Sequence, residues 1–350
     1  MTETPARAAG RRPVTLRDVA DAAGVSIKTV SNVVNDRPNV GPATRERVQQ
    51  IIRELNYRPQ VGARQLRTGT SGLITLAIPS LAGSYFSELA QAFAQEAQRR
   101  RHSIMLHTTV GGAEEERSVL SGFTRVIGDG VIFSPIAIGE DTLAAMDRTI
   151  QPTVFIGEHV PEQALPAGSD YVHTDNVQAA ADATAHLAQR GSRRIAYVGA
   201  LTVAEAAQEH STSRLRVAGY RQALAERGLG PPVVQAVETW TLEGGAAAVP
   251  PLLANCPDVD GIVCGNDEIA RGVMLALRTR GLEVPQQVRV IGYDDTRESR
   301  YTTPTLSSID PQREQLVGTV LDMLIERIQG YDGPPRRVIA PHRLMARASS

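Results

Sequence analysis

From residue 73 onward, short apolar runs of strand length alternate with stretches that follow a helical pattern. The runs LITLAIP (73–79), SIMLHTT (103–109) and DGVIFS (129–134) are separated by such helical stretches. This alternation is typical of parallel sheets with helices on both faces. We therefore predict an α/β fold for most of the 350-residue chain.

Two parts of this region resemble each other. The sequence DGVIF at 129–133 is echoed by DGIVC at 260–264, and each is followed by a second strand-like run, VFIGE at 154–158 and VIGYDD at 290–295. Two similar α/β lobes leave a cleft at the carboxyl ends of their strands, where open parallel sheets bind ligands. We predict that residues 71–350 form a two-lobed domain whose site residues follow the strands.

Residues 14–58 show a different pattern. Thr15 and Asp18 have the spacing of a capping box, and apolar residues at helical spacing follow them. Gly24 can adopt the positive φ that ends such a helix, and Ser26 is suited to cap the next one. The sequence predicts a helix, a tight glycine turn and a second helix.

Pro42 fits the first turn of a third helix, which completes a small three-helix head. Such stripes also fit any small helical bundle. The second helix, however, directs several side chains away from its valines, where they could reach base edges in a major groove. The residues of this head that we predict to contact DNA are Thr15, Ser26, Ile27, Lys28, Thr29, Ser31 and Asn32.

The charge is distributed unevenly along the chain. Residues 1–70 carry 12 Lys and Arg against 6 Asp and Glu, whereas the remainder carries 25 against 32. A basic head on an acidic body indicates that the head meets phosphate groups.

Cys256 and Cys264 lack the spacing of metal or redox pairs, so we expect structural thiols in a reducing compartment. We expect a disordered tail at residues 1–13 without a signal peptide, and no apolar run long enough to cross a membrane. The protein is accordingly expected to be cytoplasmic, without a metal or cofactor.

No catalytic motif is evident. Lys28 is the single lysine, which excludes a phosphate-binding Gly-x4-Gly-Lys loop, and neither a His-Glu-x-x-His pair nor a Gly-x-Ser-x-Gly elbow is present. The seven histidines are scattered, and His186 is expected to be a surface or half-buried side chain. We expect a protein that is not an enzyme.

The segments VTLRDVADAAGVSIKTVSNVVND (14–36) and TRERVQQIIRELNYRP (44–59) closely resemble the DNA-binding head of the lactose-repressor (LacI/GalR) family. The resemblance implies a hinge helix and linker at 59–70 that folds on DNA and pairs with its twin in a second subunit. It further implies that Ala63 lies against the floor of the minor groove and that Leu66 is the wedge that kinks the duplex.

The resemblance extends to about residue 345, over a core similar to periplasmic sugar-binding proteins. It implies an effector site that includes Arg216 in SRLRVAGY, Asn266 in CGND and Asp294 in IGYDD. A guanidinium and a carboxylate offer paired donors and acceptors to vicinal hydroxyls. The other residues predicted to bind the effector are Tyr85, Phe86, Glu158 and Trp240.

Some polar residues near the strand ends allow a second interpretation. Trp240 could instead be a core residue, and Asp175 could cap the helix that follows it. Asp267 and Asp295 are expected only to cap helices or to lie in turns.

Taken with the resemblance, these features predict a sequence-specific DNA-binding transcriptional regulator, a repressor of sugar-utilisation genes. We expect a homodimer that reads a pseudo-palindromic operator in double-stranded DNA and responds to a small-molecule effector, a sugar. The alternative is a sugar-binding module that does not read DNA sequence. The basic helix-turn-helix head and the lack of a signal peptide favour the regulator.

Overall fold

The computed structural model describes residues 14–34, 37–57, 70–122, 128–160, 165–201 and 211–350. The chain divides into two compact units, residues 1–71 and 72–350. The tail predicted at 1–13 and the hinge predicted at 59–70 lie outside the described residues, apart from residue 70; so do Ala63 and Leu66. In the described part, no helix is long and apolar enough to span a bilayer.

The first unit contains the three predicted helices, α1 (Leu16–Ala23), α2 (Ile27–Val34) and α3 (Pro42–Glu54). The capping box is confirmed, because the Thr15 N–H donates to the Asp18 carboxylate at 2.7 Å and the Asp18 N–H donates to the Thr15 hydroxyl at 3.3 Å. Gly24 ends α1 with φ of 64°. The buried apolar residues of this unit are Val19, Ala20, Ala23, Val30, Val33, Val48 and Tyr57.

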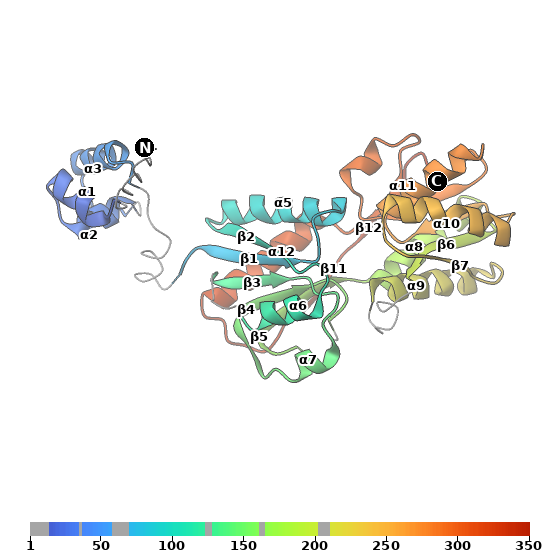
Figure 1. Ribbon diagram of the computed structural model, residues 1–350, viewed down its shortest axis with the longest axis horizontal. Helices are drawn as coiled ribbons and strands as arrows, with labels where there is room; N and C mark the ends of the chain where they lie inside the picture. Colours follow the sequence, from blue (N-terminus) through green and yellow to red (C-terminus); the bar gives the residue numbers. More distant parts are fainter. Residues whose placement is uncertain (1–13, 35–36, 58–69, 123–127, 161–164, 202–210) are drawn as a thin grey trace, which may run out of the picture. The chain divides into compact units, whose positions relative to one another are not determined.

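The first lobe of the second unit is built on a parallel sheet of order β11-β5-β4-β3-β1-β2 (Figure 1). Its strands are β1 (Leu73–Ile78), β2 (Ser103–Thr108), β3 (Gly130–Phe133), β4 (Arg148–Ile156), β5 (Ala167–Thr174) and β11 (Arg337–Ala340). Helices α5 (Ser84–Arg99) and α12 (Arg313–Ile328) cover one face, and α6 (Ala113–Leu120) and α7 (Glu140–Ala144) cover the other.

The second lobe repeats this arrangement, with the sheet order β12-β10-β9-β8-β6-β7. Its strands are β6 (Ile195–Leu201), β7 (Val233–Val237), β8 (Gly261–Cys264), β9 (Arg289–Tyr293), β10 (Ser307–Asp310) and the antiparallel β12 (Arg343–Met345). Its helices are α8 (Asn176–Gln189), α9 (Thr212–Arg227), α10 (Leu242–Asn255), α11 (Asp267–Thr279) and the 3-10 helix η2 (Arg297–Arg300).

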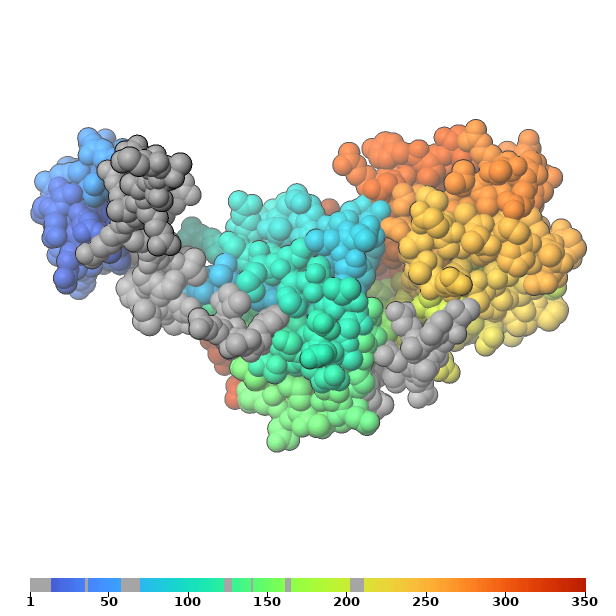
Figure 2. Space-filling view, viewed as in Figure 1, coloured from blue at the N-terminus to red at the C-terminus, as the bar shows by residue number. Residues whose placement is uncertain are grey.

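The predicted duplication is confirmed by these two sheets. Strands β3 and β8, which carry the echoed sequences, occupy equivalent positions, and so do β4 and β9. In the space-filling view the first lobe is mainly turquoise to green and the second mainly yellow to orange (Figure 2). The chain passes between the lobes three times: after β5, after β10 and after β11. The first lobe is therefore completed by α12 and β11, which follow most of the second lobe in the sequence.

A buried ion-pair cluster fixes these late elements to the first sheet. Asp170 on β5 is fully buried and accepts two hydrogen bonds from the Arg327 guanidinium on α12, both of 2.7 Å. Its carboxylate also accepts from the Arg336 backbone N–H and from Nη2 of the same residue, each at 2.8 Å. One carboxylate thus joins β5, α12 and the start of β11.

Candidate functional site

The predicted DNA-contacting residues of the head lie on α2 or at its start, except for Thr15, which is the N-cap of α1. Ile27 and Lys28 are exposed, whereas Ser31 and Asn32 are half-buried. Ser26 caps α2, as predicted: its hydroxyl accepts from the Thr29 N–H at 3.1 Å and lies 2.9 Å from the Thr29 hydroxyl. Thr15 and Ser26 therefore have a structural role whether or not they contact DNA.

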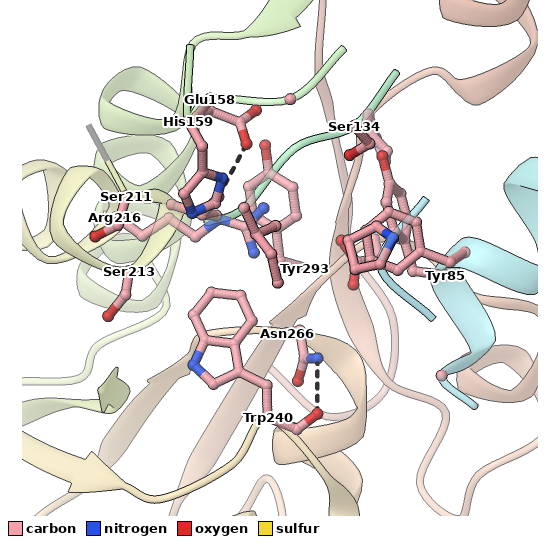
Figure 3. Close-up of a pocket in the computed structure, with 18 of the residues that line it drawn as sticks. Tyr85, Ser134, Glu158, His159, Ser211, Ser213, Arg216, Trp240, Asn266 and Tyr293 are labelled. Atoms are coloured by element: carbon pink, nitrogen blue, oxygen red, sulfur yellow. Dashed lines mark hydrogen bonds between the residues drawn. The ribbon is translucent and has the colours of Figure 1, made fainter. Parts of the chain in front are cut away.

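A cavity of about 540 Å³ lies between the two lobes of the second unit (Figure 3). Its volume is in the range of sites for small organic ligands. Its lining includes all seven residues predicted to bind the effector, which are Tyr85, Phe86, Glu158, Arg216, Trp240, Asn266 and Asp294. The first three come from the first lobe and the other four from the second.

Arg216 on α9 is the central cation of this cavity. Its Nε donates to the Asn176 side-chain oxygen at 2.6 Å, and its Nη1 donates to the Gly265 carbonyl. The guanidinium carbon lies 3.3 Å from the centroid of the Tyr293 ring and 5.4 Å from that of Trp240. Two of the five N–H groups of the guanidinium thus hold the Arg216 side chain in position, and the others remain as donors for a ligand.

Two carboxylates face this cation. Asp294 follows β9 and is only 6% exposed, yet none of the described residues donates a hydrogen bond to its carboxylate. Burial raises the pKa of Asp294 well above its usual range, although the positive charge of Arg216 acts in the opposite direction. Glu158, two residues after β4, accepts a hydrogen bond of 2.9 Å from the Thr212 hydroxyl of the other lobe.

Trp240 packs on the core, in line with the second interpretation, and also lines the cavity. Its indole N–H donates to the Gly199 carbonyl at 2.9 Å. Asn266 is the N-cap of α11: its side-chain oxygen accepts from the Ile269 N–H at 2.8 Å. The Asn266 amide nitrogen is 3.4 Å from the Trp240 carbonyl, so this amide also orients the tryptophan.

The prediction for Asp267 was wrong. Its carboxylate is fully buried and accepts hydrogen bonds from the Thr296 N–H at 2.8 Å and from the hydroxyls of Ser299 and Ser308, both at 2.6 Å. It therefore connects α11 to the loop after β9 and to β10.

Asp175 does cap α8, because its carboxylate accepts a hydrogen bond from the Gln178 N–H. Asp295 lies in a turn, where its φ is positive, and its carboxylate pairs with Arg300 and Arg347.

Burial raises the pKa of Asp267 to about 6, against an ordinary value of 3.8. The folded protein therefore binds this proton more tightly than the unfolded chain, so the contribution to stability falls as pH rises from about 4 to 6. We expect a loss of about 3 kcal/mol over this interval, which the Asp267→Asn variant would not show. Urea unfolding of both proteins at several pH values measures the difference, and parallel stability curves would contradict it.

Several lining residues were not predicted from the sequence. Tyr293, which stacks on Arg216, is the last residue of β9, and Glu268 and Thr296 follow strand ends; position after a strand was thus a usable signal. His159 and His173 also line the cavity, and burial lowers the pKa of His159, which favours its neutral form.

Both cysteines are buried free thiols, and His186 is half-buried against the Ser350 hydroxyl, as expected.

Each of the two units matches a known protein family. Residues 15–60 match the family described as bacterial regulatory proteins, lacI family, and residues 184–350 match a periplasmic binding protein-like domain. Catabolite control protein A of Priestia megaterium is 31% identical over 340 residues, which cover 96% of this chain and 99% of that protein. The transcriptional regulator CelR of Thermobifida fusca is 31% identical over 350 residues, covering 97% and 99%.

Solved structures agree with this assignment. A lac repressor dimer bound to operator and the anti-inducer ONPF superposes with a TM-score of 0.80 at 28% identity, covering 97% of this chain and 99% of that one. The complex of CelR with cellobiose gives a TM-score of 0.67 at 27% identity, covering 97% and 100%. The similarity spans the helix-turn-helix head and both lobes, and the chain belongs to the LacI family of bacterial regulatory proteins.

Proposed function

We propose that this protein is a DNA-binding transcriptional regulator whose operator affinity is changed by a sugar bound between its lobes. The observation that carries the proposal is the cavity itself, which combines a buried Arg216 with spare donors and a buried Asp294 with an unused carboxylate. Such a pair suits the vicinal hydroxyls of a sugar, because each group can make two parallel hydrogen bonds. CelR, a relative with the same architecture, has been solved in complex with cellobiose.

The head supplies the DNA-binding part of this function. Lys28 and Asn32 on the outer side of α2 are suited to guanine and adenine, respectively, in the major groove. A single three-helix head covers little DNA, so we propose a homodimer that reads a pseudo-palindrome, as the lac repressor dimer is bound to its operator. The minor-groove roles of Ala63 and Leu66 belong to the same proposal.

Coupling between the two parts follows from the two-lobed design. A ligand that contacts both lobes favours the arrangement in which its contacts are complete. We propose that the first lobes of the two subunits then move relative to each other. This movement separates the two hinges of the dimer and lowers its operator affinity. The relatives are transcriptional regulators, and we propose no catalytic role for this chain.

The proposal is tested by incubating the purified protein with fragments of the native genome at moderate salt and sequencing those it retains. We expect an enriched pseudo-palindrome, whose neighbouring genes nominate the sugar to test. Retention of random DNA, both alone and with candidate sugars present, would favour the alternative of a sugar-binding module that does not read sequence.

Base reading by α2 gives a sharper prediction. In the Asn32→Ala variant we expect discrimination at one symmetric pair of operator positions to fall by about 1–3 kcal/mol, with the others unchanged. Competition binding with operators mutated at each position measures this. Gln50→Ala, on the exposed side of α3, is the control and should leave every position unaffected. Unaltered specificity in Asn32→Ala would remove this residue from the base-reading set.

A further inference from the structure

Two glutamates connect the lobes beside the cavity. Glu268, in the first turn of α11 in the second lobe, accepts a hydrogen bond of 2.8 Å from the Ser84 N–H at the start of α5 in the first lobe. In the opposite direction, Glu88 on α5 accepts one of 2.8 Å from the Arg297 N–H at the start of η2 in the second lobe. Each lobe thus offers a carboxylate to the first N–H group of a helix in the other lobe.

Neither helix has a side-chain cap of its own. The N-cap of α5 is Gly83, which has no side chain, and the N-cap of η2 is Thr296, whose side chain makes no capping hydrogen bond. The first N–H groups of a helix have no partner within the helix and attract negative charge. The missing cap of each helix is therefore supplied across the interface between the lobes.

Glu88 is also connected to a passage of the chain between the lobes. Its second carboxylate oxygen pairs with Arg313 Nη1 at 2.9 Å, and Arg313 is the first residue of α12, directly after the chain leaves β10. Nη2 of the same arginine donates to the Asp294 carbonyl of the second lobe at 3.0 Å. The Glu88–Arg313 pair lies within the first lobe, whereas the bond from Arg313 to the Asp294 carbonyl joins the two lobes and must change when they move.

We propose that Glu88 and Glu268 form a reciprocal latch that holds the two lobes together and sets how often the cavity opens. When the lobes separate, the bonds of both glutamates break in one step, because each of them joins one lobe to the other. Glu88 does not line the cavity, so it acts as a positioning residue and not through contact with a ligand. The latch goes beyond the proposed function, since it is a property of the two lobes alone.

Amide hydrogen exchange at single-residue resolution tests the latch without DNA or effector, so the result does not depend on the regulator function. The Arg297 amide is followed in Glu268→Ala, and the Ser84 amide in Glu88→Ala. In each case the observed amide keeps its own acceptor, so faster exchange reports separation of the lobes. Loss of one charge-assisted hydrogen bond is expected to accelerate exchange about tenfold.

Glu96→Ala is a matched control. Glu96 lies on α5, its side chain is 24% exposed like that of Glu88, and it pairs with arginines, but its partners Arg99 and Arg100 are in the same lobe. It should leave both amides at the wild-type rate. The latch is overturned if each variant accelerates only the amide whose acceptor was removed. Should Glu88→Ala fail to fold, the Arg297 amide in Glu268→Ala decides by itself.

Discussion

Replacement of Asp170 by asparagine is expected to lower the free energy of unfolding by about 3–5 kcal/mol, the cost of leaving a buried cation without its partner. The Arg327 side chain is 1% exposed, and asparagine offers one acceptor oxygen instead of two, so one of the two bonds would be lost and the other would lose its ionic character. Because the same carboxylate holds Arg336, the start of β11 should also loosen. Urea unfolding at neutral pH measures the change.

The pH dependence separates this ion-pair effect from simple loss of packing. Burial acts to raise the pKa of Asp170, but hydrogen bonds from Arg327 and Arg336 outweigh it, and the pKa is lowered. Its stabilising contribution is therefore present above the unfolded pKa, about 3.9, and is lost as pH falls through the folded value. The difference in the free energy of unfolding between the wild type and Asp170→Asn should accordingly become smaller as the pH falls. An exposed pair, Arg148 with Asp332, is the control: Asp332→Asn should cost less than about 1 kcal/mol.

Replacement of Arg216 by alanine is expected to weaken effector binding at least 100-fold, since two charge-assisted hydrogen bonds of about 1.5–3 kcal/mol each would be lost. Operator affinity in the absence of effector should stay close to that of the wild type, because the head is a separate unit. The variant should therefore hold its operator at effector concentrations that change wild-type binding. Trp240, the single tryptophan and a lining residue, gives a fluorescence titration for the sugar nominated by the operator experiment.

Two further variants make this result interpretable. Arg216→Lys keeps the charge beside Asp294 but lacks the planar fork, and it should bind the effector with intermediate affinity. Arg221→Ala removes an exposed arginine from the same helix and should bind as the wild type does. An unchanged dissociation constant in Arg216→Ala would exclude the guanidinium from the site.

Local patterns were enough to predict much of the fold. The capping box at Thr15 and the positive φ at Gly24 involve neighbours within a few residues, and the echo of 129–133 at 260–264 predicted two equivalent strands. Position after a strand was also informative, because parallel strands end at the same edge of their sheet. Glu158, Asn266 and Asp294 reach one cavity for that reason, whereas their role toward a ligand stays a prediction.

Contacts between distant segments could not be predicted in this way. Asp267 follows a strand and begins a helix, which indicates a cap, but its partners come from positions 29 to 41 residues later and only folding brings them near. The interlobe bonds of Glu88 and Glu268 join residues 209 and 184 positions apart. The position after a strand marks Glu268 as a cavity residue, but nothing in the sequence around either glutamate indicates its partner in the other lobe.

The threading of the chain also determines the order in which a ribosome can complete its parts. The head is synthesised before β1 to β5, but α12, which covers one face of their sheet together with α5, is made only after β10. At about 5–20 residues per second, the interval from β5 to α12 lasts roughly 7–30 s. Throughout it, the apolar side chains that α12 covers in the finished lobe lack that cover. Each new molecule therefore has a finished head well before it has a finished cavity.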